Sequence, residues 1–142
     1  NNNVVFPLFI APYLKYNFDI PFLLAAGQIE SCFGTSGKAK RTNSIFNMSI
    51  HNKRSPYHAY DDPNKSIEHY IIIIKNNFIR NRTVNHILKP GHFKNAQGKR
   101  YAKNASYELK LKNTRKKIIK QTNIIYLQDI LKNLKETQSK IL

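Results

Sequence analysis

The chain has 142 residues, and its 24 Lys and Arg against 8 Asp and Glu give a formal net charge of +16 at pH 7. This length fits one domain, or a small domain with extensions. So strong a positive charge favours nucleic acid as the partner, ahead of an anionic membrane surface or an acidic protein. The single cysteine, Cys32, excludes an internal disulfide and a cysteine-based zinc site.

Residues 1–37 are apolar and interrupted by Pro7, Pro12 and Pro21. The prolines exclude a membrane-spanning helix of about 20 residues, and the missing basic segment at the start argues against a signal peptide. We expect an irregular extension that docks on neighbouring proteins, or else a self-packing minidomain held against the amphipathic helix predicted at the C-terminus. Its charged residues are Lys15, Asp19 and Glu30.

Residues 38–69 are polar and read as a linker, which contains the turn signal DDPN at positions 61–64. The β-branched run YIIIIK, residues 70–75, predicts a strand or a buried extended segment. Asn76 and Asn77 then offer a turn and an N-cap for a helix over 78–88. Pro90 and Gly91 would end that helix.

A second helix is predicted from about Phe93 to Gln121, weakened at Gly98. It is too polar to be held by packing alone and therefore needs an external surface. Thr122 or Asn123 would cap a third, amphipathic helix. Its apolar stripe is Ile124, Leu127, Leu131 and Leu134.

These elements predict a mainly α, non-globular chain with a short extended segment, two or three long helices and an irregular N-terminal extension. The predicted sections are 1–37, 38–69, 70–121 and 122–142.

Catalytic and metal-binding patterns are weak in this sequence. The five histidines, at positions 51, 58, 69, 86 and 92, show no tight metal-ligand spacing, and Asp61-Asp62 reads as a turn pair. The segment GTSGK, residues 34–38, lacks the spacing of a phosphate-binding loop. Cys32 lies in an apolar stretch, which argues for an inert thiol. We therefore expect no enzyme activity, metal, cofactor or small-molecule substrate.

The basic residues of the second helix surround most of its circumference, which suits a helix threaded between RNA segments, with tyrosines stacking on bases. A solvated, partly disordered basic tail is the alternative. The residues predicted to contact RNA are Arg80, Arg82, Lys94, Lys99, Arg100, Tyr101, Lys103, Lys110, Lys112, Arg115, Lys116, Lys117 and Lys120.

The segment RTVNHILKPGHFKNAQGKRYAKN, residues 82–104, resembles the small-subunit ribosomal protein family numbered twenty-one, especially its mitochondrial branch. YIIIIKNN would match the extended segment of that family, GKRY its basic element with a tyrosine, and YELKLKNTRKK its long basic helix. The match covers about residues 70–120. The sequence departs from the family pattern at residues 102–104, where a proline is missing.

The resemblance implies a structural protein of an organellar small ribosomal subunit that binds small-subunit rRNA, with ribosomal proteins contacted through residues 1–37. It implies a mitochondrial location, with a plastid-type organelle as the alternative, and no membrane partner. A free-standing organellar RNA- or DNA-binding factor is the second hypothesis. A membrane-peripheral protein with an apolar start and a basic end is the third.

Overall fold

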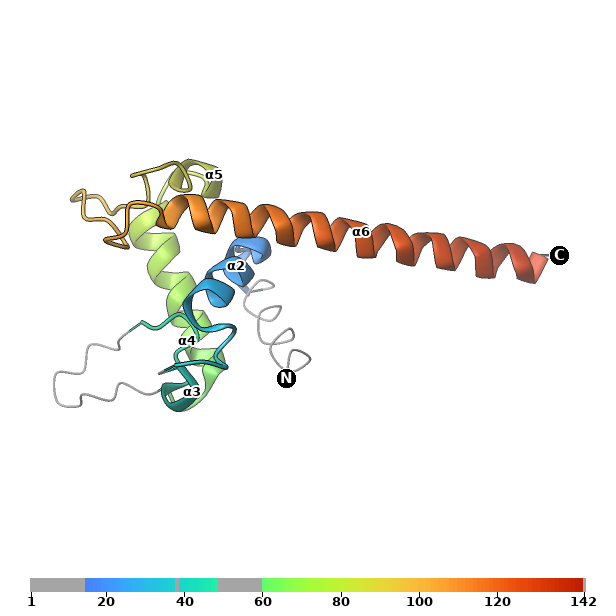
Figure 1. The fold of residues 1–142 in the computed structure, drawn as a ribbon, viewed down its shortest axis with the longest axis horizontal. Coiled ribbons are helices and arrows are strands. Elements are labelled where there is room, and N and C mark those ends of the chain that lie inside the picture. The colour runs from blue at the N-terminus through green and yellow to red at the C-terminus, as the bar shows by residue number, and fades with distance from the viewer. Residues whose placement is uncertain (1–14, 38, 49–59, 142) are drawn as a thin grey trace.

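The computed structural model describes residues 15–37, 39–48 and 60–141 (Figure 1). The predicted class, mainly α, is confirmed, and within the described residues there is no strand beyond one isolated bridge between Lys94 and Arg100. Residues 1–14 of the predicted extension, together with His51 and His58, lie outside the described part. The helices are α2 (Ile20–Ser31), α3 (Ala39–Thr42), α4 (Pro63–Ile73), the π-helical segment η1 (Ile74–Ile79), α5 (Val84–Ile87) and α6 (Tyr107–Ile141).

Helix α2 lies inside the segment predicted to be irregular. Asp19 caps its N-terminus, because the Asp19 carboxylate accepts a hydrogen bond of 2.7 Å from the Phe22 N–H. Pro21 sits in the first turn, where a missing N–H costs no helical hydrogen bond. A proline that interrupts an apolar run therefore starts a helix here.

Helix α4 and segment η1 contain the run predicted as a strand, so that prediction is wrong. Asp62 caps α4 by accepting from the Asn64 N–H at 2.8 Å, and Pro63 is the first helical residue. The buried residues then fall at three- and four-residue spacing, which is the spacing of one helix face: Ile67, Tyr70, Ile71 and Ile74. Packing of that face outweighs the strand preference of the isoleucines.

The segment between η1 and α6 is mostly loop, and the helices predicted over 78–88 and from Phe93 are wrong in extent. The cap of α5 is Thr83, not Asn76 or Asn77, which lie within η1. The Asn95 carboxamide accepts from the backbone N–H groups of Gln97 and Lys99, and Gly98 has a φ of +80°. This side-chain-capped turn replaces helical hydrogen bonds over residues 95–99.

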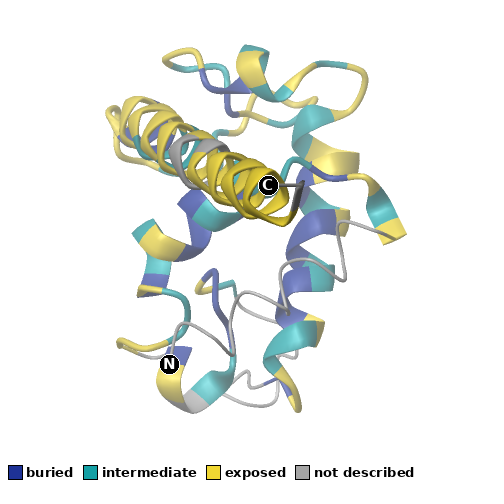
Figure 2. Cartoon of the chain, turned by 90° about the vertical axis from the view of Figure 1, so that its right-hand side faces the viewer, coloured by how far each residue is buried: buried dark blue, intermediate teal, exposed yellow. Residues whose placement is uncertain are grey.

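Helix α6 is one continuous helix, so the predicted break at Thr122 or Asn123 is wrong. Its first turns pack across α2, and the remainder projects from the body with the C-terminus at its far end (Figure 1). Viewed along its axis, most of α6 is exposed (Figure 2).

The contact between α2 and α6 includes an ion pair. The Arg115 guanidinium donates to both carboxylate oxygens of Asp19, at 3.2 and 2.7 Å. Asp19 thus caps α2 and holds α6 against it at the same time.

The core draws on distant parts of the sequence. It joins α2, the segment around Phe46, helix α4 with η1, and the loop that leads into α6. Its members therefore cross the predicted limits at residues 37 and 69. Among the residues described, no helix is long and apolar enough to cross a membrane.

Candidate active site

Glu30 lies one residue before the end of α2, where the chain turns sharply. Cys32 has left-handed backbone angles, and Gly34 follows with a φ of +82°. A Cβ added at Gly34 would lie only 3.4 Å from the Ile45 side chain, so the turn passes close to the segment that follows α3. The buried hydroxyl of Ser31 ties the two together, since it donates to the Ile45 carbonyl at 2.5 Å and accepts from the Gly34 N–H at 2.8 Å.

This turn brings Asn47 to the end of α2. The Asn47 side-chain amide donates to the Glu30 carbonyl oxygen at 2.5 Å. The polar end of α2 is therefore covered by a residue seventeen positions further along the chain, while the Glu30 carboxyl remains half-buried rather than enclosed.

Tyr107, the first residue of α6, reaches the same carboxyl. Its hydroxyl donates to Glu30 Oε1 at 2.9 Å across 77 positions of sequence. The start of α6 is fixed locally, because the Asn104 carboxamide oxygen accepts from the Ser106 N–H at 2.9 Å and from its hydroxyl at 2.8 Å. The Tyr107 side chain is itself buried, which fixes the direction of its hydroxyl.

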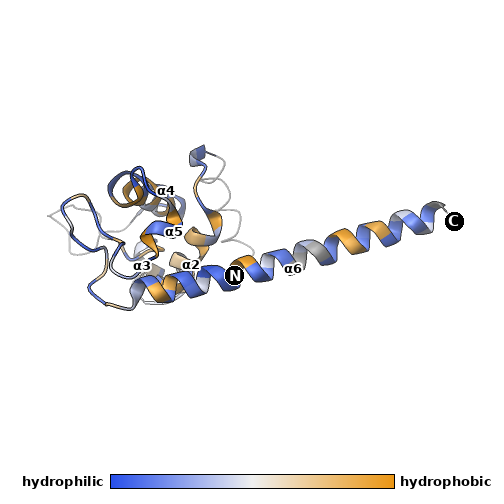
Figure 3. Cartoon of the chain, turned by 90° about the horizontal axis from the view of Figure 1, so that it is seen from above, coloured by the Kyte–Doolittle hydropathy of each residue, from blue (hydrophilic) through white to orange (hydrophobic). Residues whose placement is uncertain are grey.

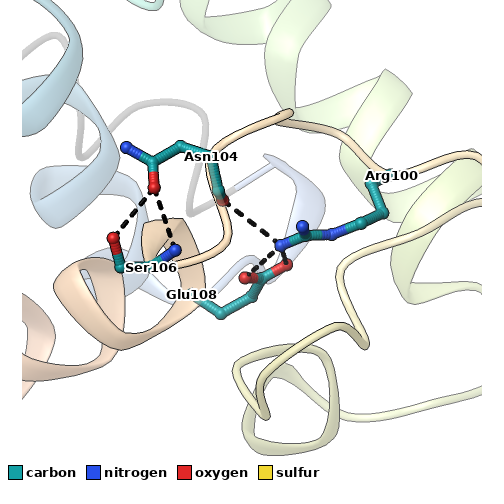
Figure 4. Close-up of polar contacts among 4 residues, drawn as sticks. All are labelled: Arg100, Asn104, Ser106 and Glu108. Atoms are coloured by element: carbon teal, nitrogen blue, oxygen red, sulfur yellow. Dashed lines mark hydrogen bonds and ion pairs between the residues drawn. The ribbon is translucent and has the colours of Figure 1, made fainter.

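A second interaction locks the first turn of α6 to the preceding loop. One Arg100 nitrogen donates to both oxygens of the Glu108 carboxylate, at 2.8 and 2.7 Å, and to the Asn104 carbonyl at 3.3 Å (Figure 4). The Glu108 side chain is only 1% exposed. Because Glu108 follows Tyr107 directly, this pair also holds Tyr107 in place.

Three tyrosines lie within reach of the Glu30 charge, and their rings pack on other aromatic side chains: Tyr70, Tyr101 and Tyr107. Tyr70 stacks on Phe46, with ring centroids 3.9 Å apart, and Tyr101 stacks on Phe93 at 4.8 Å. Tyr101 also lies 5.8 Å from Tyr107. The Tyr70 hydroxyl is buried and has no hydrogen-bond partner among the described residues.

The electrostatics follow from this burial. Removal from water raises the pKa of the Glu30 carboxyl above its usual range, while hydrogen bonds from Tyr107 and Asn47 and the positive charge of Lys110 reduce the rise. Burial also raises the pKa of the phenols of Tyr70, Tyr101 and Tyr107, and the negative charge of Glu30 adds to each rise.

Such a carboxyl can act as a general acid. A raised pKa keeps the proton on the group at a pH where an ordinary glutamate has lost it. Glu30 combines this raised pKa with a half-exposed side chain and a fixed position on a helix end.

The other seven carboxylates of the chain have different environments. Five of them cap helices or pair with a basic side chain of the chain: Asp19, Asp61, Asp62, Glu68 and Glu108. The remaining two, Asp129 and Glu136, are exposed on the projecting part of α6.

The residues predicted to contact RNA separate into two groups. Four are used inside the chain. Arg82 donates to the backbone carbonyls of Phe78, His92 and Lys94, Arg100 and Arg115 form the ion pairs described above, and Tyr101 belongs to the aromatic cluster. The other nine are exposed: Arg80, Lys94, Lys99, Lys103, Lys110, Lys112, Lys116, Lys117 and Lys120.

Of the histidines at described positions, His86 and His92 lie close together. His92 Nδ1 lies 3.4 Å from His86 Nε2. Within residues 15–37, 39–48 and 60–141, no three His, Cys, Asp or Glu side chains come together to hold a metal ion.

Glu30 was missed as a site residue, although the sequence carries a signal for it. It is the one acid between Ile20 and Gly37, an apolar stretch that the structure folds into a buried helix and a tight turn. A lone carboxyl at the end of a buried helix must be desolvated, and desolvation perturbs its pKa. No comparable local signal marks Tyr107.

A family model described as Glucosaminidase, mannosyl-glycoprotein endo-beta-N-acetylglucosaminidase, matches residues 7–123. The match spans most of the chain and includes Glu30, Asn47, Tyr70, Tyr101 and Tyr107. No curated protein matches the chain.

This match corrects several predictions made from the sequence. The resemblance to the ribosomal family is wrong, as are the predicted ribosomal role, the RNA- or DNA-binding role and the rRNA partner. The expectation of no enzyme activity and no small-molecule substrate is wrong too, since the family is one of glycosidases that act on glycans. The resemblance rested on basic residues that the fold partly uses for its own ion pairs. The mitochondrial location stays a prediction.

Proposed function

The chain belongs to the glucosaminidase family, and we propose that it is a glycoside hydrolase that cleaves β-linked N-acetylglucosaminyl bonds within a glycan, with Glu30 as the general acid. The observation that carries the assignment is the Glu30 carboxyl itself. It is half-buried, its pKa is raised by burial, and Tyr107 orients it from a distant part of the chain. In this role Glu30 protonates the glycosidic oxygen as the bond to C1 breaks.

Most glycosidases use a second carboxylate as nucleophile or base. In this chain the other carboxylates cap helices, pair with basic side chains or project on α6, as described above. An N-acetylglucosaminyl substrate carries its own nucleophile, the carbonyl oxygen of the 2-acetamido group. Reactions of this substrate-assisted kind are a recognised exception to the two-carboxylate scheme.

The steps then balance with Glu30 alone. The Glu30 proton moves to the leaving oxygen, the C1–O bond breaks, and the acetamido oxygen bonds to C1 to give a cyclic oxazolinium ion. Water next attacks C1 from the opposite face while the Glu30 carboxylate takes its proton, and the bond between C1 and the acetamido oxygen breaks. Glu30 ends protonated, ready for another turnover.

Two displacements at C1 should leave the product in the β configuration. Proton NMR of the first sugar released, recorded before mutarotation, measures this directly. An initial α product would contradict the role of the acetamido group, because it requires a single displacement by water.

Replacing Tyr107 with Phe should move the pH dependence of activity. The Tyr107 hydrogen bond stabilises the charged Glu30 carboxylate and lowers its pKa. Without it the pKa of Glu30 rises further, so the loss of activity at high pH should shift to a higher pH. We expect kcat to fall about tenfold as the carboxyl loses its orientation. If kcat of this variant falls at the same high pH as kcat of the native chain, the Tyr107 hydroxyl does not act on the Glu30 carboxyl.

The function is tested by measuring new reducing ends from three glycans that contain β-linked N-acetylglucosamine: chitin oligosaccharides, peptidoglycan and a mannosyl glycoprotein. At least one should be cleaved by the native chain and left intact by the Glu30→Gln variant. Cleavage that persists in Glu30→Gln would remove Glu30 from the mechanism, and the absence of cleavage of all three would overturn the proposed activity.

A further inference from the structure

The outward side of α6 carries a row of lysines. Lys112, Lys116 and Lys120 are four residues apart, so at 3.6 residues per turn they lie on one face. The residues of α6 that pack on the body, Tyr107, Leu111 and Ile118, lie on the opposite face. The lysines are exposed along their whole row.

Large apolar side chains continue the same face. Leu109, Leu131 and Leu134 are 51%, 57% and 60% exposed. Leu109 and Lys120 are eleven residues apart, as are Lys120 and Leu131, and eleven residues is about three turns of helix. Leucines therefore flank the lysine row at both ends, and Figure 3 shows apolar patches along the projecting part of α6.

We propose that this face of α6, made of Leu109, Lys112, Lys116, Lys120, Leu131 and Leu134, lies on an anionic lipid bilayer. The lysines are complementary to the phosphates of anionic headgroups, and the leucines would enter the boundary between headgroups and acyl chains. The net charge of +16 draws the whole chain toward such a surface.

The combination of charge and leucines fits an anionic lipid surface better than an acidic polymer or a parallel copy of the same helix. An acidic polymer would satisfy the lysines but would leave the exposed leucines in water. A second copy of α6 paired in parallel would cover the leucines, but it would bring the two lysine rows together, and like charges repel. A bilayer with anionic headgroups satisfies both sets of side chains at once.

The arrangement keeps the candidate active site free of the lipid. Tyr107, which orients Glu30, lies on the body side of α6 rather than on the lysine face. Figure 3 shows α6 running along one edge of the body, so one side of the helix is open to a flat surface.

The test uses the full chain and flotation with vesicles of phosphatidylcholine and phosphatidylglycerol in a two-to-one ratio. The native chain should float with these vesicles and much less with pure phosphatidylcholine. The triple variant Lys112→Gln, Lys116→Gln, Lys120→Gln should bind roughly a hundredfold more weakly. The double variant Leu131→Ala, Leu134→Ala should lose about tenfold or more.

Two control variants remove the same groups elsewhere. Lys40→Gln, Lys65→Gln, Lys89→Gln makes the same change of charge on exposed lysines away from α6, and Ile72→Ala shortens an exposed apolar side chain on α4. The vesicle affinity of both variants should lie within about threefold of the native affinity. A change of this size is smaller than the loss expected when one lysine is removed from the lipid-facing surface.

Three results would overturn the proposal. The first is equal binding to neutral vesicles. The second is vesicle binding that is unchanged in the leucine variant, together with a lysine-dependent association with a soluble polyanion such as polyglutamate. The third is a concentration-dependent dimer in sedimentation that the leucine variant abolishes, with no vesicle binding. Cleavage of a soluble glycan fragment should be unchanged in all of these variants, so this test is independent of the catalytic assignment.

Discussion

Replacing Glu30 with Gln should lower kcat on the cleaved glycan by a factor of ~10²–10⁴, the usual contribution of a general acid. Gln keeps the size of the side chain and an oxygen that can accept from the Tyr107 hydroxyl, but it carries no proton to give to the glycosidic oxygen. Substrate affinity should change little, because the loss falls on the step in which the C1–O bond breaks.

The same variant should unfold at a higher temperature than the native chain near neutral pH. Burial raises the pKa of Glu30 in the folded state above its unfolded value. A carboxyl with a raised folded pKa contributes its stability below the unfolded pKa and loses it as the pH rises through the folded pKa. Gln carries no charge to desolvate, so the gain in Tm should disappear when the pH falls below the unfolded pKa of the carboxyl.

Glu136→Gln is the matched control, since it makes the same chemical change on an exposed glutamate of α6. It should alter neither kcat nor the Tm near neutral pH. If Glu30→Gln retains native kcat, the assignment of the general acid fails. If its Tm follows that of the native chain at every pH, burial does not perturb the carboxyl.

The helical class could be predicted from the sequence, but several element types could not. The run of residues 70–75 favours a strand by composition. The structure makes it helical because Asp62 and Pro63 start a helix upstream, and this start places Ile67, Tyr70, Ile71 and Ile74 on one face. Asp62 and Pro63 belong to the segment DDPN, which was predicted as a turn but starts helix α4 in the structure. Tertiary packing decided between the strand and the helix.

The helix predicted from Phe93 is wrong for a different reason. Judged by helix propensity, residues 93–101 favour a helix that is weakened only at Gly98. The structure shows that the Asn95 side chain accepts two backbone N–H groups and so stabilises a turn that a helix would have to break. Propensity along the chain does not reveal this competition in advance.

The candidate site could be predicted only in part. The isolation of Glu30 in an apolar stretch is a local property and can be read from the sequence. Its contact with Tyr107 joins positions 77 residues apart and depends on α2 packing against α6. The charge count also concealed the internal roles of Arg100 and Arg115, because a count does not distinguish a guanidinium that faces solvent from one that pairs with a carboxylate of the same chain.

Replacing Arg100 with Ala should lower the free energy of unfolding by about 3–5 kcal/mol, the cost of leaving a buried charge without its partner. The Glu108 carboxylate is 1% exposed, and one Arg100 nitrogen holds both of its oxygens. Against a total stability of about 5–15 kcal/mol, this is a large loss. Urea unfolding at constant pH measures it.

The exposed neighbour Lys99 provides the control, and Lys99→Ala should cost less than about 1 kcal/mol. The double variant Arg100→Met, Glu108→Leu removes both charges and keeps apolar volume, so it should regain most of the stability that Arg100→Ala loses. Activity should stay low in this double variant, because the pair also fixes the turn that carries Tyr107 toward Glu30. A cost for Arg100→Ala no larger than that of Lys99→Ala would mean that Glu108 is not held as a buried charge. Recovery of stability without activity would instead separate the packing role of the pair from its role in positioning Tyr107.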